Sequence, residues 1–183
     1  IAQQIATPKD DALKDILDAH DEDGRLVVYA GFQGSIDKLS ALVKAQGWEY
    51  IKVDGRGWIT SITGLRKPED MLLIFQDKGR TYPKVCFIGQ PSSAGMGLTL
   101  TESCETVYYS NDFNFESRSQ SEDRIHRPGA DFNRGVTITD LIHLPSDLKV
   151  LDNLQKKKRL QDLSLGEFRE VLNAADPLGP LLF

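Results

Sequence analysis

The chain has 183 residues, with 22 basic and 27 acidic side chains, 40% hydrophobic residues and a formal net charge of −5. This composition is that of one compact globular domain, and it excludes disordered, collagen-like and coiled-coil proteins. No apolar run approaches the roughly 18 residues of a membrane span, and the first residues lack a signal-peptide pattern, so we expect a cytoplasmic protein with no membrane partner.

The negative charge is concentrated in one segment. Residues 9 to 23 hold seven acidic and two basic residues, a difference equal to the net charge of the whole chain. The rest is neutral overall and keeps clusters of basic residues, so an anion-binding face is possible there. A charge run is nevertheless more often a solvated surface. The basic clusters are Arg56 with Arg66 and Lys67, residues 118–134, and residues 156–159.

Apolar periodicity and breaking residues divide the chain into alternating helices and strands. Apolar residues at helical spacing mark helices, and a capping box at Thr7 and Asp10 opens the first of them. Short apolar runs between turn residues mark strands. The predicted helices cover residues 8–20, 36–47, 68–75 and 116–127, with two more beginning near 148 and 164. The predicted strands cover residues 25–29, 49–53, 84–88, 106–109 and 136–142.

Five mostly apolar strands separated by helices predict an α/β fold, in which a mostly parallel sheet is covered by helices on both faces. Residues 54–64 contain three glycines and little periodicity, and we interpret them as an irregular loop. Ligands of such sheets bind beyond the carboxyl ends of the strands. We therefore expect the site in the loops after residues 29, 53, 88, 109 and 142.

The most informative motif is Gln120-Ser-Glu-Asp-Arg124-Ile-His-Arg127-Pro-Gly. On a helix Gln120, Arg124 and Arg127 share one face, because they stand at i, i+4 and i+7. Two guanidinium forks at that spacing suit a polyanion such as a triphosphate, whose oxygens accept paired hydrogen bonds. The alternative is a structural pair of surface arginines bonded to carboxylates such as Glu116 or Asp123, and the residues alone leave both readings open.

A stretch rich in glycine and serine, Ser92-Ser-Ala-Gly95-Met-Gly97-Leu-Thr, follows the predicted strand 84–88. Glycines and hydroxyls there let backbone amides approach a phosphate closely, although a Gly-x-Gly is also an ordinary tight turn. The sequence has no Gly-x4-Gly-Lys-Ser/Thr pattern, so this chain has no Walker A loop of its own. Its histidines and cysteines have no metal-ligand spacing, and we expect them to be structural.

The order of these pieces resembles motifs V and VI of the Swi/Snf-type DNA-dependent ATPases of helicase superfamily two. The Ala-Gly-Met-Gly-Leu-Thr variant is similar to the branch with the annealing helicases, and the compactness is similar to that of bacterial or phage members. The resemblance assigns residues 1–183 to a helicase C-terminal domain, with its core at about 8–164 and a C-terminal helix and tail at 165–183. The chain departs from the family at Phe113-Asn-Phe, where Trp-Asn-Pro is usual, and at Pro128-Gly-Ala, where Ile-Gly-Gln is usual.

This resemblance implies a three-layer RecA-like domain that is the second motor lobe of an ATP-dependent DNA translocase in the cytoplasm of a bacterial or phage-infected cell. Its partners would be the backbone of double-stranded DNA and the N-terminal RecA-like lobe of the same polypeptide. That first lobe would hold most of the ATP and Mg²⁺, so the isolated chain is expected to be inactive. The implied residues are Arg127 and Arg124 as catalytic arginines, Gln120, Gly95 and Gly97 for ATP, Ser92, Ser93, Gly31 and Gly34 for DNA, and none for a metal.

Two other functions stay open. One is a stand-alone DNA- or protein-binding module without ATPase activity, and the other is a small nucleotide-binding enzyme that uses Gly95 and Gly97. A Walker A loop and an Asp-Glu-x-His-type motif upstream of the chain would favour the ATPase. Trp48 and Trp58 are candidates for stacking on bases, but aromatic residues near strands more often belong to the core.

Overall fold

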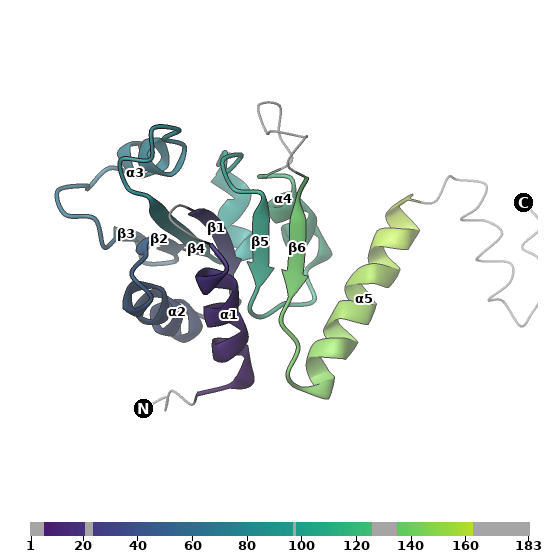
Figure 1. The fold of residues 1–183 in the computed structure, drawn as a ribbon. Helices are drawn as coiled ribbons and strands as arrows, with labels where there is room; N and C mark the ends of the chain where they lie inside the picture. The colour runs from purple at the N-terminus through teal and green to yellow at the C-terminus, as the bar shows by residue number, and fades with distance from the viewer. Residues whose placement is uncertain (1–5, 21–23, 97, 126–134, 163–183) are drawn as a thin grey trace, which may run out of the picture.

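A computed structural model describes residues 6–20, 24–96, 98–125 and 135–162. The strands are β1 (Gly24–Tyr29), β2 (Glu49–Asp54), β3 (Gly57–Thr60), β4 (Lys84–Gly89), β5 (Glu105–Tyr108) and β6 (Thr137–Asp140). They form one sheet in the order β3-β2-β4-β1-β5-β6, in which only the β2–β3 pair is antiparallel (Figure 1). The mostly parallel sheet that the sequence predicts is confirmed.

Five α-helices and one short 3-10 helix connect these strands within the described residues. They are α1 (Pro8–Asp18), α2 (Gln33–Ala45), α3 (Pro68–Phe75), η1 (Pro91–Met96), α4 (Phe115–Glu122) and α5 (Pro145–Asp162). At the start of α1 the amide of Thr7 donates to Asp10 Oδ2 at 2.8 Å, which is one half of the predicted capping box. Proline occupies the first turn of both α1 and α3, where the missing N–H costs no helical hydrogen bond.

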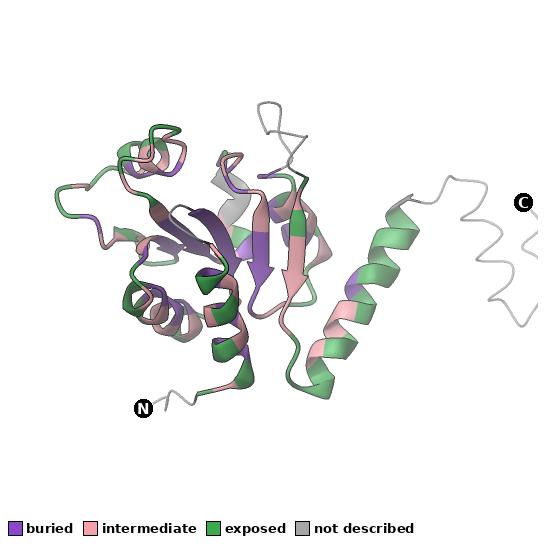
Figure 2. Ribbon diagram, in the orientation of Figure 1, coloured by how far each residue is buried: buried purple, intermediate pink, exposed green. Residues whose placement is uncertain are grey.

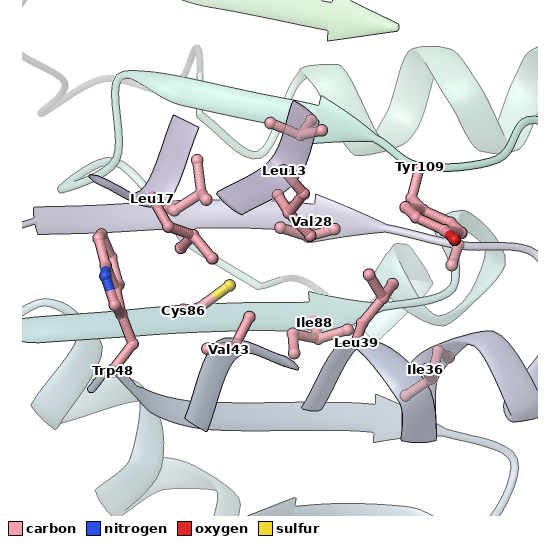
Figure 3. Close-up of a cluster of buried hydrophobic side chains, with 13 residues drawn as sticks. Leu13, Leu17, Val28, Ile36, Leu39, Val43, Trp48, Cys86, Ile88 and Tyr109 are labelled. Atoms are coloured by element: carbon pink, nitrogen blue, oxygen red, sulfur yellow. The ribbon is translucent and has the colours of Figure 1, made fainter. Parts of the chain in front are cut away.

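One face of the sheet is covered by α1 and α2. Leucines of these helices, such as Leu13, Leu17 and Leu39, pack onto Val28 and Ile88 of the central strands (Figure 3). Cys86 lies in the same layer and is fully buried. Figure 2 shows the central strands as a buried band between more exposed helices.

The other face is covered by α3, by residues 98–100 before β5 and by the chain just after α4. Met71 and Phe75 from α3, together with Leu98, Leu100 and Ile125, form a second buried cluster with the sheet. Successive residues of β1 thus alternate between the two layers, and all six are buried. This double burial explains why the strand is a continuous apolar run, and it makes the fold the predicted three-layer α/β domain.

The structure differs from the predicted elements in three places. Residues 54–64 are not wholly irregular, because β3 turns back on β2 through a tight hairpin in which Gly57 has a φ of 103°. The α4 helix ends at Glu122, five residues before the predicted end, and η1 forms where a loop was predicted. The helix predicted from residue 164 and the tail 165–183 lie outside the described residues.

Candidate functional site

The four residues implied for DNA lie beyond the carboxyl ends of β1 and β4, as the topology rule predicts. Gly31 follows β1, and Gly34 lies in the first turn of α2, where an added Cβ would meet no atom within 4 Å. Ser92 and Ser93 lie in η1, directly after β4, with Ser92 exposed and Ser93 half-buried. The backbone of Gly31 and the start of η1 are therefore neighbours at one edge of the sheet.

Two residues that the sequence analysis missed hold these turns together. Gln90 donates from Nε2 to the carbonyl of Gly31 at 3.0 Å, while its own carbonyl accepts from the amide of Ser93 at 3.0 Å. Ser110, after β5, accepts from the amide of Gly31 at 2.9 Å. Both backbone groups of Gly31 are thus occupied, which leaves the serine hydroxyls and the first amides of α2 as the polar groups for a ligand.

The basic residue Arg56, at the same edge, is neutralised within the domain. Its guanidinium donates to both oxygens of Asp37 at 2.8 Å and to Asp54 Oδ2 at 2.6 Å. Lys52 adds a contact of 2.6 Å to Asp37. Hydrogen bonds from Arg56 and then Lys52 hold the pKa of the Asp37 carboxyl well below its usual range. Arg56 therefore contributes little to the anion-binding face considered above, whereas Arg66 and Lys67 are exposed.

Arg124 lies just beyond the end of α4, and its positive charge acts on Tyr29 at the end of β1. The carbonyl of Arg124 accepts from the amide of Leu100 at 3.1 Å, and the carbonyl of Leu100 accepts from the amide of Ser103. The hydroxyl of Ser103 donates to the carbonyl of Arg25 at the start of β1. The Arg124 side chain is only 6% exposed. Burial raises the pKa of nearby Tyr29, and the positive charge of Arg124 offsets part of that rise.

The predicted common face of Gln120 and Arg124 is wrong. Gln120 is exposed, and its Nε2 donates to Glu116 Oε1 at 3.1 Å, whereas Arg124 points inward. The physical reason is that α4 ends at Glu122, so the helical i, i+4 relation stops before Arg124. Arg127 and Gly97 lie outside the described residues, and Gly95 lies in η1. The assignment of these residues to ATP stays a prediction.

Arg118 forms the kind of structural ion pair that was weighed for the motif arginines. Its Nη1 and Nη2 donate to the two oxygens of Asp140, at 2.6 and 3.1 Å, and its Nε donates to Glu122 at 2.5 Å. The guanidinium carbon lies 3.4 Å from the ring centroid of Tyr108. Arg118 is therefore a buried side chain that links α4 to the end of β6.

A polar network joins α1 to the start of α5. Lys9 Nζ lies 3.0 Å from the carbonyl of Tyr109 and 2.8 Å from Asp147 Oδ2. The Tyr109 hydroxyl donates to Asp10 Oδ1 at 2.9 Å, and Lys38 of α2 lies 2.6 Å from Asp10 Oδ2. The first turn of α5 is thus held by a charge on the first turn of α1.

The described residues hold neither a membrane-spanning helix nor a metal-binding cluster. No described helix is both long and apolar enough to cross a membrane. Over the same residues, no group of three or more histidine, cysteine, aspartate or glutamate side chains could hold a metal ion.

No protein-family model matches the sequence. The chain is 28% identical over 145 residues to "Helicase ssl-1" of Caenorhabditis elegans and 25% identical over 142 residues to "Helicase domino" of Drosophila melanogaster. These alignments cover 78% and 77% of this chain but only 6% and 4% of the two relatives. The chain therefore spans a small part of the proteins that it matches.

The fold is similar to a solved structure described as "Crystal structure of the C-terminal part of Fun30 ATPase domain". The TM-score is 0.62 at 22% identity, over 80% of this chain and 45% of that one. This likeness establishes the fold alone, which is a RecA-like α/β fold.

The organisms in which the relatives occur correct two predictions. Besides the worm and the fly, these organisms include Arabidopsis thaliana and Cryptococcus neoformans, whose similar protein is named "Chromatin-remodeling ATPase INO80". The predicted bacterial or phage branch is therefore wrong, and so is the predicted bacterial or phage cytoplasm. Over about four fifths of its length the chain is similar to helicases and chromatin-remodelling ATPases of eukaryotes, and it has the fold of the C-terminal part of such an ATPase domain.

Proposed function

We propose that this chain is the second motor lobe of an ATP-dependent, double-stranded-DNA translocase of the chromatin-remodelling type, acting in the nucleus. The observation that supports the proposal most is that the region implied for DNA and the region implied for ATP are packed together in one domain. η1 carries Ser92 and Ser93 at the carboxyl edge, and Leu100, four residues after the end of η1, bonds to the backbone of Arg124. The similarity to eukaryotic helicases supports the same assignment.

DNA is contacted through its phosphates at the carboxyl edge. The amides at the start of α2 and the hydroxyls of Ser92 and Ser93 are hydrogen-bond donors, and a helix N-terminus favours an anion. Gly34 keeps this approach open because it has no side chain. The amide and carbonyl of Gly31 are already bonded to Ser110 and Gln90, so Gly31 shapes the turn and does not itself bind a phosphate.

ATP and Mg²⁺ are held mainly by the N-terminal lobe of the longer polypeptide. From this lobe Arg127 reaches the phosphates, Arg124 braces it from inside the domain, and Gln120, Gly95 and Gly97 complete the nucleotide-facing side. In phosphoryl transfer a positioned arginine stabilises the charge that develops on the transferred group, and it is worth roughly 10³ to 10⁵ in rate.

The test uses the natural polypeptide that contains this chain together with the lobe before it. Replacing Arg127 with Ala is expected to lower DNA-stimulated ATP turnover by about two orders of magnitude and to leave ATP affinity nearly unchanged, because the contact forms mainly in the transition state. Arg127→Lys should restore little, since a point charge cannot reproduce the planar fork. Near-normal turnover of Arg127→Ala would show that Arg127 does not serve ATP hydrolysis.

The isolated chain 1–183 gives a second readout. It is expected to hydrolyse no ATP, because the sequence has no loop of the Walker A type. DNA-stimulated turnover by the purified chain would contradict this proposal. DNA binding by a longer polypeptide that hydrolyses no ATP would instead identify a binding module.

A further inference from the structure

Gln76 caps the C-terminus of α3 and reaches a segment far from it in sequence. Its amide nitrogen donates to the carbonyl of Thr99, and its amide oxygen accepts from the hydroxyl of Thr101 at 3.4 Å. Both ends of one side-chain amide are therefore used on residues 98–101, which we call the return segment because it leads the chain back from η1 toward β5.

The end of α3 is a fixed base for this contact. Arg25, which is 3% exposed, donates from Nε to the carbonyl of Phe75 at 2.8 Å and from Nη1 to the carbonyl of Pro83 at 2.8 Å. These bonds satisfy a carbonyl that the helix end leaves free, and they tie α3 to the starts of β1 and β4. The backbone that carries Gln76 is thus anchored to the centre of the sheet.

The return segment is held on its inner side by other groups. Leu98 and Leu100 are buried in the cluster that contains Phe75 and Ile125, and the amide of Leu100 donates to the carbonyl of Arg124 at 3.1 Å. Thr99, between the two leucines, is exposed and turned toward Gln76. The inner residues therefore set the depth of the segment, whereas Gln76 bonds its outer side.

We propose that Gln76 is a positioning residue that keeps the return segment in register between η1 and Arg124, and that it thereby couples DNA contact to ATP hydrolysis. The inference rests on the proposed function, because it assigns DNA to η1 and ATP to the arginines. Leu100, whose amide bonds to the carbonyl of Arg124, is only four residues from the last residue of η1 in the sequence, so the return segment is the short link between the two sites. Without Gln76 the return segment loses both bonds to α3, so it can shift when η1 moves and leave the backbone of Arg124 in place.

The experiment measures the ratio of ATP turnover with and without duplex DNA in the two-lobe polypeptide. Gln76→Ala removes both bonds, Gln76→Glu keeps an acceptor for Thr101 but loses the donor to Thr99, and Thr101→Val removes only the hydroxyl bond. We expect the ratio to fall about tenfold in Gln76→Ala, which loses both hydrogen bonds, and to fall less in Thr101→Val, which loses only one of them. Glu69→Gln, on the exposed first turn of α3, is the matched control and should keep the ratio.

Thermal unfolding of each variant separates positioning from folding. A lower ratio in Gln76→Glu with an unchanged melting temperature supports the inference, because a purely structural role would change both together. An unchanged ratio in both Gln76→Glu and Thr101→Val overturns it, even if Gln76→Ala fails to fold. A wild-type polypeptide without DNA-stimulated turnover overturns the proposed function and this coupling with it, whereas an active wild type with unaffected variants overturns the coupling alone.

Discussion

Gly24 is required at its position by close packing. A Cβ on this residue would lie 2.5 Å from Cη2 of Trp48 and 2.9 Å from Nδ1 of His20. The two rings meet edge to face, with centroids 5.2 Å apart, and Trp48 is 1% exposed. Trp48 is packed in the core layer between α1 and the sheet, so its ring cannot move away without disturbing that layer. The prediction that Trp48 belongs to the core is thereby confirmed.

We expect Gly24→Ala to lower the free energy of unfolding by about 1 to 3 kcal/mol, the usual cost of forcing extra volume into a packed core. Denaturant unfolding at equilibrium measures the change. Gly34→Ala is the matched control, because its Cβ would meet nothing within 4 Å and alanine favours a helix by roughly 0.5 to 1 kcal/mol over glycine. Equal stability of Gly24→Ala and wild type would mean that Trp48 is not fixed in place.

At the scale of elements, the start of α5 depends on the ionised Asp147 carboxylate. Burial opposes its charge, but Lys9 and the amides of His143 and Leu144 outweigh that effect and lower the pKa of Asp147 to about 2. The two amides donate to Oδ2 at 2.9 and 3.1 Å. A carboxylate with a lowered pKa stabilises the fold fully above its unfolded pKa near 4, and the stabilisation is lost as pH falls toward 2.

Asp147→Asn is therefore expected to lower stability at pH 6 by at most about 2 kcal/mol, and to differ less from wild type at pH 2. The difference in unfolding free energy between the two proteins, followed from pH 6 to pH 2, tests this. Asp11→Asn is the control, since Asp11 is exposed and paired only with Lys14 among the contacts described. A constant difference across that range would exclude ionisation of Asp147 as the cause.

Elements that carry a local signal could be predicted from sequence. The predicted strands agree with β1, β2 and β4 to within a residue at each end, and the buried β1 and β4 have the continuous apolar runs that parallel strands covered on both faces show. β3 was missed since its four residues are only partly buried and gain order by pairing with β2. The end of α4 was misjudged because the motif suggested helical spacing beyond Glu122.

The contacts of the candidate site had no local signal. Gln76 bonds to a residue 23 positions away, Gln90 to one 59 positions away, and Ser110 to one 79 positions away. Only the sheet order brings these partners together. The sequence could therefore indicate which loops hold the site, but not which side chains fix the shape of those loops.

For the molecule as a whole, the acidic charge is concentrated on α1, whose first turn lies near the carboxyl ends of the strands, because Lys9 bonds to the carbonyl of Tyr109 after β5 and Asp10 to Lys38 of α2. The exposed Asp11 in that turn is therefore expected to weaken the binding of phosphates at this edge without excluding it. Binding of that kind depends on the DNA backbone and not on base identity.

Affinity for duplex DNA is accordingly expected to fall with salt, by about 0.9 logarithmic units per tenfold rise in salt for each phosphate that a lysine or arginine neutralises, and to be the same for different sequences. Fluorescence anisotropy with two duplexes of equal length and unrelated sequence measures both properties. Replacing both Ser92 and Ser93 with Ala should weaken binding to the two duplexes equally. A strong preference for one duplex at fixed ionic strength would argue for base contacts instead.

The buried thiol of Cys86 can report whether α1 and α2 move away from the sheet. Burial raises the pKa of its thiol, and the sulfur lies beneath the layer formed by α1 and α2 (Figure 3). A thiol reagent needs both access and a thiolate, so it modifies Cys86 only from conformations in which that layer has lifted off the sheet. Cys104 is half-buried and serves as the faster reference within the same chain. The ratio of the two labelling rates, compared with and without DNA, would show whether nucleic acid binding tightens or loosens that side of the domain.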